Sequence, residues 1–442
     1  MSSLIWTQSR AVGAFRWLLV AITLAFAILS LETPLRSLEE PFVYRKDLVQ
    51  EYILAKAILA GDNPYLLSAH IRELAGRYVP GYSDPWDPGL PTYHPTAHPP
   101  TTGMLFLPIS ILSYPQSALA WLLLEVVGLV ISLYLLARAS GLRLPIAAAL
   151  ILAAAALDWY PAPFELALGQ LTLAQLPFLA GAIASIRSRR PALAGALAGV
   201  AILIKPFPWP VLLVFLLKRE WKTLLAAGAV LLLGWGAATA LIGIDSVVTY
   251  FTQAIPFIDE GYRAQIWNIS LRTWGWKLFA GTGSTMSLGD SAPPLVPLLP
   301  AAQPISVALP VAALLLGCYF TWRLPSTAWA FGLMICIGIL ASPIAWAFYL
   351  FLAPIPVAQV VEWLARHRFP AGETNAALVV AILLLLPPEA WAFLLTPTLG
   401  PLLPPSMGDP APFVQVIAHL GPAVALAALA ALVVALGLRD RR

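Results

Sequence analysis

The segment YRKDLVQEYILAKAILAGDNPY, from Tyr44 to Tyr65, is a short polar stretch that follows the first long apolar stretch of the chain and precedes many more. The chain as a whole is 60% hydrophobic and only 11% charged. Soluble domains have an apolar share nearer one half, so this composition indicates an integral membrane protein. In such a chain the segment places the carboxylate of Asp47 at a membrane surface, which makes it the first place to look for chemistry.

The apolar stretches predict an all-α polytopic membrane protein with about 12 transmembrane helices, because a span needs roughly 20 apolar residues. The alternating pattern of a β-barrel strand is absent from these stretches. The expected spans lie near residues 14–31, 116–137, 144–158, 170–186, 191–205, 206–217, 223–242, 305–322, 326–341, 346–365, 375–395 and 413–438.

Basic residues assign the two sides of the membrane, because short cytoplasmic loops are enriched in Lys and Arg. The pattern predicts a multi-pass protein of the plasma (inner) membrane, with both termini cytoplasmic and the acid-rich loops outside. The net charge of +4 then reflects topology, and no nucleic-acid partner is expected. The first apolar stretch is interpreted as a retained signal anchor. The basic residues of the cytoplasmic side are Arg10, Arg16, Arg138, Arg143, Arg187, Arg189, Arg190, Lys218, Arg219, Lys222, Arg323, Arg366, Arg368, Arg439, Arg441 and Arg442.

The whole chain, 1–442, is expected to form a single integral membrane domain with unusually long extracytoplasmic loops. Residues 32–115 and 243–304 exceed the length that a connection requires, and long loops in compact proteins usually carry function. We expect 32–115 to be the catalytic loop and 243–304 to be a second extracytoplasmic loop.

Within the first loop, Leu48 and Tyr52 recur at helical spacing with Lys46 and Glu51 opposite them, which predicts an amphipathic helix in the membrane interface. Asp47 stands at its beginning. An aspartate there is either the N-cap of the helix or a general base, and the residues alone leave both open.

Lys205 is the sharpest signal inside the predicted spans. An ammonium at the end of an apolar helix is costly and usually faces a cavity or an anionic partner, although snorkelling to the interface is the alternative. The sequence PFPWP that follows Lys205, and Ser342-Pro343 further on, predict broken helices that line an outward-facing cavity. A phosphate at the membrane surface is the natural counter-ion for Lys205.

Other polar residues of the outer side are weaker candidates. His94 and His98 would suit a metal only on a helix, which the proline between them opposes, so substrate hydrogen bonding or loop packing is favoured. Gln170 either binds polar substrate groups or caps a helix. The same two alternatives apply to Asn268. Arg272 is better explained as a phosphate contact than as an isolated outer charge.

Six motifs, taken in order, resemble the polyprenol-phosphate-dependent mannosyltransferases of glycosyltransferase family 87, within the GT-C class. The likeness covers about residues 40 to 365. It implies a GT-C-type fold whose first extracytoplasmic loop carries amphipathic helices, and it implies that neither a metal nor another cofactor is needed. The motifs are DLVQEYILAKAILAGDNPY, YHPTAHPPTTGMLFLPISIL, GQLT, LIKPFPWPVLL, NISL and SPIAWAFYL.

The chain departs from the family pattern at two places. The family's Gly-Gln-x-Asn is GQLT here, so Thr172 replaces an amide. The family's Ser-Pro-x-Ser-Trp segment commonly continues into a histidine, whereas this chain has Phe348 and Tyr349. If that histidine touches the donor phosphate elsewhere in the family, another group does so here.

The sequence therefore predicts an inverting glycosyltransferase that moves a hexose, mannose in the first instance, from a polyprenyl-phosphate sugar to a glycolipid or glycan hydroxyl on the extracytoplasmic face. Transfer of a pentose or aminosugar, and a lipid or sugar transporter or flippase, are the alternatives. Asp47 is expected to be the catalytic base, and Lys205 and Arg272 are expected to bind the donor phosphate. The residues assigned to substrate binding are Tyr52, Tyr65, His94, His98, Gln170, Asn268 and Trp346.

Overall fold

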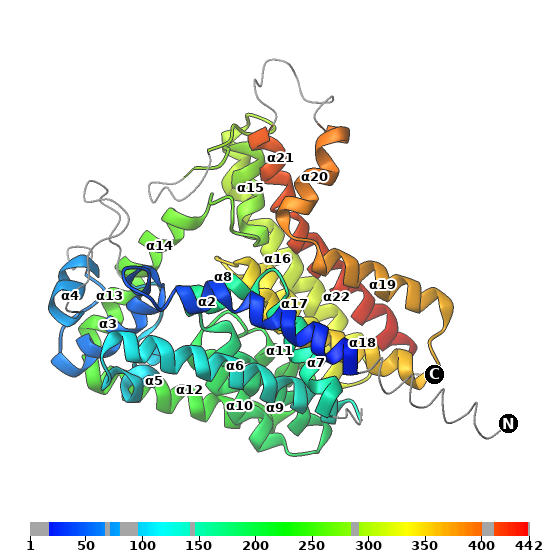
Figure 1. The fold of residues 1–442 in the computed structure, drawn as a ribbon, viewed down its shortest axis with the longest axis horizontal. Coiled ribbons are helices and arrows are strands. Elements are labelled where there is room, and N and C mark those ends of the chain that lie inside the picture. Colours follow the sequence, from blue (N-terminus) through cyan, green and yellow to red (C-terminus); the bar gives the residue numbers. More distant parts are fainter. Residues whose placement is uncertain are drawn as a thin grey trace.

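The regular structure of this protein is helical. The computed structural model describes residues 17–66, 71–79, 96–141, 146–283, 291–399 and 411–440. Within these residues the only extended pairing is an isolated bridge between Thr282 and Ala292. The all-α fold class expected from the sequence is confirmed (Figure 1).

Helices follow one another along the chain in four groups. The first is α2 (Glu32–Arg36), η1 (Phe42–Arg45), α3 (Leu48–Ala60), α4 (Ile71–Tyr78) and α5 (Pro100–Ser110). The second is α6 (Tyr114–Ala139), α7 (Ile146–Leu157), α8 (Ala162–Leu168), α9 (Thr172–Arg187), α10 (Pro191–Ile204), α11 (Val211–Leu217) and α12 (Trp221–Ile242). The third is α13 (Ile244–Thr249), the π-helix η2 (Tyr250–Ala254), α14 (Ile255–Tyr262) and α15 (Leu271–Phe279). The fourth is α16 (Leu299–Arg323), α17 (Thr327–Ala341), η3 (Ala347–Leu352), α18 (Pro354–Arg366), α19 (Ala371–Leu385), α20 (Pro388–Leu399), α21 (Ala411–Ala418) and α22 (Gly421–Arg439).

The protein is a multi-pass membrane protein. Among the described residues, 6 helices are long and apolar enough to span a membrane, and the number rises to 8 if two bent pairs count as one span each. The count of about twelve expected from the sequence is not confirmed. Several of the expected spans are shorter or broken helices, such as α10 and α17, which are apolar but have fewer than 18 residues.

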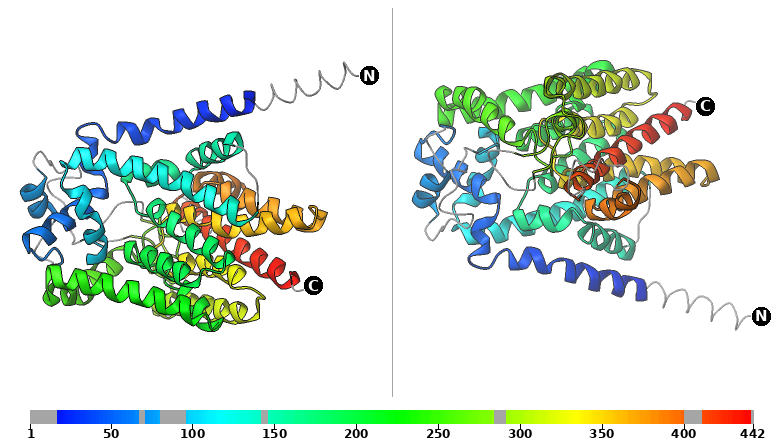
Figure 2. Two further views of the ribbon diagram at one scale, coloured as in Figure 1. Left: turned by 90° about the horizontal axis from the view of Figure 1, so that it is seen from below. Right: turned by 90° about the horizontal axis from the view of Figure 1, so that it is seen from above.

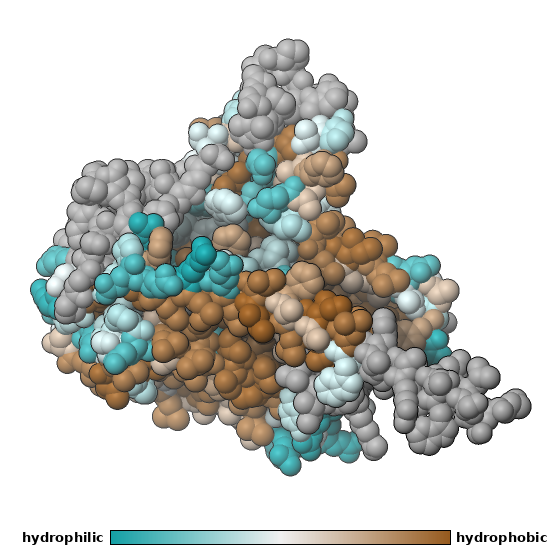
Figure 3. All heavy atoms as spheres, in the orientation of Figure 1, coloured by the Kyte–Doolittle hydropathy of each residue, from teal (hydrophilic) through white to brown (hydrophobic). Residues whose placement is uncertain are grey.

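The outer surface of the bundle is apolar, as a lipid-facing surface must be. One face carries a continuous hydrophobic area, with hydrophilic residues gathered above it and at its lower tip (Figure 3). Leu232 and Leu233 on α12 are 76% and 73% exposed, and Leu315 on α16 is 66% exposed. The helical segment Trp17–Arg36 runs along the outer edge of the bundle (Figure 2) and is mostly exposed as well.

Small residues allow close approach between α10 and its neighbour α12. A Cβ atom added at Gly195 would lie 1.9 Å from the carbonyl oxygen of Thr223, so only glycine fits there. Close backbone contact at small residues is the usual way in which membrane helices associate, because lipid offers no hydrophobic driving force between them. α10 packs closely against α12 in this way, and it also packs against α9.

α3 differs from the amphipathic interfacial helix that its residue spacing predicts. Its polar side is not exposed, since Glu51 is 1% exposed and Lys46, just before the helix, is 3% exposed. Leu59, near its end, is 62% exposed. The physical reason is that α3 packs against α4, α5 and α6 and is enclosed by protein on several sides. Its charged side chains therefore face the interior.

The predicted helix breaks are confirmed, and two more are added. α10 ends at Ile204 and Lys205 is extended, while α17 ends at Ala341 and the chain stays non-helical until η3. The third break separates α8 from α9, which meet at a bend of 113°, and the fourth separates α19 from α20, which meet at a bend of 103°. Side chains of the protein satisfy the last carbonyls of α10, as expected where backbone leaves the helical pattern at membrane depth. Thr101 bonds the carbonyl of Leu203, Thr102 bonds that of Ile204, and Gln175 bonds those of Ala201 and Lys205.

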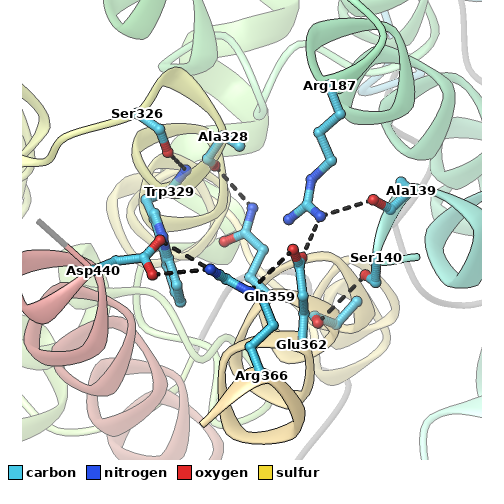
Figure 4. Close-up of polar contacts among 11 residues, drawn as sticks. Ala139, Ser140, Arg187, Ser326, Ala328, Trp329, Gln359, Glu362, Arg366 and Asp440 are labelled. Atoms are coloured by element: carbon cyan, nitrogen blue, oxygen red, sulfur yellow. Dashed lines mark hydrogen bonds and ion pairs between the residues drawn. The ribbon is translucent and has the colours of Figure 1, made fainter. Parts of the chain in front are cut away.

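Ion pairs join several helix ends in one cluster (Figure 4). For α9 and α17 these are the ends remote from the breaks. Arg187, at the end of α9, pairs with Glu362 on α18 and donates to the Ala139 carbonyl at 2.8 Å. Arg366 lies 3.6 Å from Glu362 and 3.1 Å from Asp440. The indole of Trp329 donates to Asp440 at 3.0 Å. The ends of α6, α9, α17, α18 and α22 are thus tied into one cluster.

Candidate active site

Three residues from distant parts of the sequence form a hydrogen-bonded chain. The amide of Gln170 donates to the Asp47 carboxylate at 2.5 Å, and its carbonyl oxygen accepts from Nζ of Lys205 at 3.3 Å. Asp47 precedes α3, Gln170 lies in the α8–α9 bend, and Lys205 follows α10. A carboxylate and an ammonium are therefore held beside each other at two helix breaks.

The side chain of Asp47 does not cap α3. Asp47 occupies the N-cap position, but its carboxylate makes no hydrogen bond to the first turn of the helix. It is turned toward Gln170 instead and remains half-buried. Of the two interpretations that the sequence left open, the structural cap is thereby disfavoured, because a capping side chain would be occupied by backbone N–H groups.

A glycine allows the bend that carries Gln170 to approach α3. Gly169 has a φ of +66°, in the left-handed region, and a Cβ atom there would lie 2.9 Å from Cβ of Leu48. Any other residue would be strained by its backbone conformation and crowded by Leu48. The GQ dipeptide thus places the amide of Gln170 next to the start of α3.

Lys46 fixes the other side of Asp47. Its ammonium donates to the hydroxyl of Ser37 at 2.6 Å and to the carbonyls of Ala167 and Leu166 at 2.5 and 3.3 Å. These carbonyls end α8, where unsatisfied acceptors attract a cation. Burial lowers the pKa of Lys46 to about 8. Helical spacing predicts an exposed polar face for Lys46, whereas its side chain is buried and bonds to the end of α8.

The environment of Asp47 makes it a stronger base than an ordinary aspartate. Its pKa is raised to about 6, first by burial and second by the negative charge of Glu51. Lys205, the hydrogen bond from Gln170 and Lys46 act in the opposite direction, in that order. A carboxylate with such a pKa is ionised at neutral pH and still able to take a proton.

Lys205 is buried, with 7% of its side chain exposed, and it lies against aromatic rings. Its Nζ is 4.4 Å from the ring centroid of Tyr349 and 5.6 Å from that of Phe348. The positions where the family pattern commonly has a histidine therefore supply ring faces to the ammonium. Snorkelling is excluded as the reason for its position, because the side chain points inward.

Asn268 ties the loop between α14 and α15 to the break after α17. Its amide donates to the carbonyls of Tyr262 and Pro343 at 3.2 Å each, and its oxygen accepts from the backbone N–H groups of Ser270 and Ala345. The side chain is completely buried. All of its bonds go to backbone, so its present role is to hold these two loops together.

Lys277 on α15 reinforces the same loop from behind. Its ammonium donates to the carbonyls of Ile266 and Asn268 at 2.8 and 2.6 Å and is 1% exposed. Burial lowers the pKa of Lys277 to about 7. This role was not predicted, since in sequence a single lysine of a loop resembles any surface cation.

Arg272 lies on α15, just after this loop, and Trp346 lies between the break after α17 and η3. Arg272 pairs with Asp259 on α14 at 2.5 Å, and its Nε is buried without a hydrogen-bond partner among the described residues. The ring of Trp346 meets that of Tyr262 edge-on at 5.4 Å between centroids. Tyr262 is also close enough to Asp47 for their charges to interact.

The remaining candidates from the first loop contact the protein itself. The hydroxyl of Tyr52 donates to the Leu112 carbonyl at 2.9 Å, and that of Tyr65 donates to the His98 carbonyl at 3.0 Å. The ring of His98 contacts the carboxylate of Glu51. His94 lies outside the described residues.

A comparison with protein families identifies the chain. The model of glycosyltransferase family 87 matches residues 96–343, which is more than half of the chain. No curated protein and no solved structure matches it. The matched region includes Gln170, Lys205 and the loop around Asn268, whereas Asp47 precedes it. This membrane protein therefore belongs to glycosyltransferase family 87.

Proposed function

We propose that the protein is an inverting glycosyltransferase that moves a hexose, mannose in the first instance, from a polyprenyl-phosphate sugar to a hydroxyl group of a glycolipid or glycan on the extracytoplasmic face. The observation that carries the proposal is the chain of bonds from Asp47 through Gln170 to Lys205. It holds a base of raised proton affinity next to a buried cation, which are the two groups that such a transfer needs.

Asp47 is the general base in this proposal. The acceptor hydroxyl gives its proton to the carboxylate while its oxygen forms a bond to the anomeric carbon. The bond from that carbon to the phosphate oxygen breaks on the opposite face, so the configuration inverts and polyprenyl phosphate leaves. General-base assistance of this kind contributes typically about 10²- to 10⁴-fold in rate.

Lys205 stabilises the leaving phosphate in this proposal, because negative charge grows on the phosphate oxygen as the bond breaks. A cation fixed in a buried site requires little reorganisation as that charge develops. The rings of Tyr349 and Phe348 restrict the ammonium to one region. Because these rings stand where the family commonly has a histidine, Lys205 has to supply the positive charge at this place.

Arg272 contributes a second phosphate contact. Its ion pair with Asp259 orients the guanidinium, and a phosphate can share it because a guanidinium has five N–H donors. The unpartnered Nε of Arg272 supports this role. Trp346, whose ring packs on Tyr262, is proposed to line the path of the lipid or sugar.

The other substrate-binding candidates act mainly by positioning in this proposal. Gln170 orients the Asp47 carboxylate and connects it to the cation. Asn268 keeps the loop that carries Arg272 next to the break that precedes Trp346. Tyr52 and Tyr65 support the loop through their backbone contacts.

The test is sugar transfer by the purified, detergent-solubilised protein with radiolabelled polyprenyl-phosphate-mannose and an extract of the host's lipids. Transfer in the wild type and its loss by at least about 10²-fold in Asp47→Asn are expected if Asp47 is the base. Asp62→Asn is the matched control, because Asp62 belongs to the same loop but pairs with Arg77 away from the site.

Three other outcomes would contradict the proposal in different ways. Equal transfer by wild type and Asp47→Asn would remove Asp47 from the role of base. Transfer from other prenyl-phosphate sugars alone would assign the donor to a pentose or aminosugar. No transfer from any prenyl-phosphate sugar would favour a transporter.

A further inference from the structure

Glu51 is a buried carboxylate that the proposed reaction does not use. It follows Asp47 by four residues, so one turn of α3 puts both carboxylates on the same side of the chain. Only 1% of Glu51 is exposed. Apart from the ring of His98, no described residue forms a hydrogen bond or ion pair with either of its oxygens.

The ring of His98 is held against Glu51 by its own backbone. The hydroxyl of Tyr65 donates to the His98 carbonyl at 3.0 Å, and the backbone N–H of His98 donates to the hydroxyl of Thr96 at 3.2 Å. The hydroxyl of Tyr250 reaches the Ala97 carbonyl at 3.5 Å. The contact between His98 and Glu51 is therefore built into the loop.

The charged groups around the two carboxylates divide into opposing sets. Lys205 and Lys46 face Asp47 with positive charge, whereas Glu51 faces it with negative charge. Tyr262, on α14, also interacts with Asp47, and Tyr65 interacts with Glu51.

The helices packed on α3 add few other charges. α5 and α12 contribute no acid, and the one basic residue on them, Lys222 of α12, is exposed. On α4, Arg77 and Tyr78 are engaged with Asp62 at the end of α3, and Arg77 also lies near Glu73. Glu125 on α6 interacts with Lys46. Glu165 on α8 interacts with Lys205. Glu51 is thus the one carboxylate among the described residues whose charge acts on Asp47 itself.

The opposing charges around Asp47 determine how strongly its carboxylate binds a proton. Two lysines beside a carboxylate lower its affinity for a proton and weaken it as a base, which is unfavourable for accepting a proton from a hydroxyl group. A second negative charge one turn away restores that affinity. Burial strengthens the effect, because the charges are poorly screened by water.

We propose that Glu51, held in place by His98, is a positioning residue that maintains the basicity of Asp47 against Lys205 and Lys46. It touches no substrate and acts only through Asp47. This inference rests on the proposed role of Asp47 as the base of the transfer reaction.

The test compares pH profiles of kcat/KM for the wild type and Glu51→Gln. Loss of the charge moves the acid limb to lower pH by about half a unit or more, which is a threefold or larger decrease in proton affinity. The plateau at high pH falls at the same time, because the base is weaker. Glu51→Asp, which keeps the charge, leaves the limb near its wild-type position.

Two further variants separate this effect from structural damage. Glu73→Gln removes an exposed carboxylate from α4 and should leave the profile unchanged. Glu51→Met replaces the buried carboxylate by an apolar side chain of similar length and should fold even if Glu51→Gln does not, with the same shift. If Glu51→Gln and Glu51→Met both lower the plateau of kcat/KM but leave the acid limb in place, the proposal is overturned.

A titration that does not depend on catalysis distinguishes this proposal from the proposed function. Infrared spectra of protein labelled with ¹³C-aspartate follow the Asp47 carboxyl, which is assigned by the signal that Asp47→Asn loses. A shifted Asp47 titration in Glu51→Gln without sugar transfer would sustain this inference and reject the proposed function. Sugar transfer that depends on Asp47, together with an unshifted Asp47 titration in Glu51→Gln, would support the proposed function and reject this inference.

Discussion

The amide of Gln170 donates a hydrogen bond to the carboxylate of Asp47, although 123 residues separate them in the chain. The same side chain accepts a hydrogen bond from Lys205. Gln170 thus connects the proposed base to the proposed phosphate-binding cation.

The first prediction concerns the pH dependence of the wild-type enzyme. Asp47 has to be ionised to accept a proton, and its pKa lies at about 6. The value of kcat/KM should therefore be constant above pH 7 and fall as pH decreases through 6, tending to tenfold per unit. An acid limb centred near pH 4, the ordinary value for aspartate, would show that burial does not act on the base as described.

The second prediction concerns Gln170→Leu. The hydrogen bond from Gln170 lowers the pKa of Asp47, so its removal should move the acid limb of kcat/KM to higher pH. The rate should also fall, because the carboxylate loses its orientation. Gln253→Leu, at an exposed position of η2, is the control. A limb that stays in place would mean that Gln170 does not bond to Asp47 in the working enzyme.

The third prediction concerns Lys205→Met. Loss of a fixed donor to a developing oxyanion costs about 10²- to 10³-fold in kcat, and a loss of that size is expected here. Lys205→Arg should recover part of the activity, because a guanidinium also binds phosphate. Lys222→Met removes an exposed lysine on α12 and should have no effect. Measured kcat values near wild type for Lys205→Met would exclude Lys205 from stabilising the leaving group.

The fourth prediction concerns the helix ends opposite the site. Arg187→Met leaves Glu362 without one of its two arginine partners and removes the bond to the Ala139 carbonyl. Breaking such a partly buried pair should lower the Tm of the solubilised protein by a few degrees, with KM unchanged. Arg323→Met, at an exposed position that ends α16, should leave Tm unchanged. If both variants unfold at the same temperature, the cluster adds no stability.

The fifth prediction concerns the contact between α10 and α12. Gly195→Ala forces a Cβ atom against the Thr223 carbonyl and should destabilise the protein by about 1–3 kcal/mol. Gly228→Ala is the matched control, because no heavy atom lies within 4 Å of a Cβ atom there. It should be neutral or slightly stabilising, since alanine favours helix more than glycine does. Thermal unfolding in detergent compares the two, and equal Tm values would show that α10 can move away from α12.

Much of the architecture is predictable from local sequence. Apolar stretches indicate the membrane class, and the prolines after Lys205 and Ser342 indicate the breaks that end α10 and α17. The number of spans is less predictable, because short apolar stretches form broken or enclosed helices as readily as complete spans. The bend between α8 and α9 was missed, although Gly169 is a signal for it.

The candidate site was predictable in part. Asp47, Gln170 and Lys205 are singled out by the sequence, and they come together in the structure. The burial of Lys46 and Glu51 was not predicted, because helical spacing placed them on a face that other helices cover. The bonds of Asn268 to backbone were also not predictable, since its partners come from another loop.

The sequence by itself determined that this chain lies in a membrane as helices, where two of those helices break, and which acid and which lysine are the first candidates for chemistry. These properties depend on the hydrophobicity of each stretch and on the local backbone limits of proline and glycine. Only the tertiary structure decided that Gln170 joins Asp47 to Lys205 and that His98 meets Glu51. Such pairings arise from the packing of segments distant in the chain, where shape and burial, which no local pattern contains, select the partners.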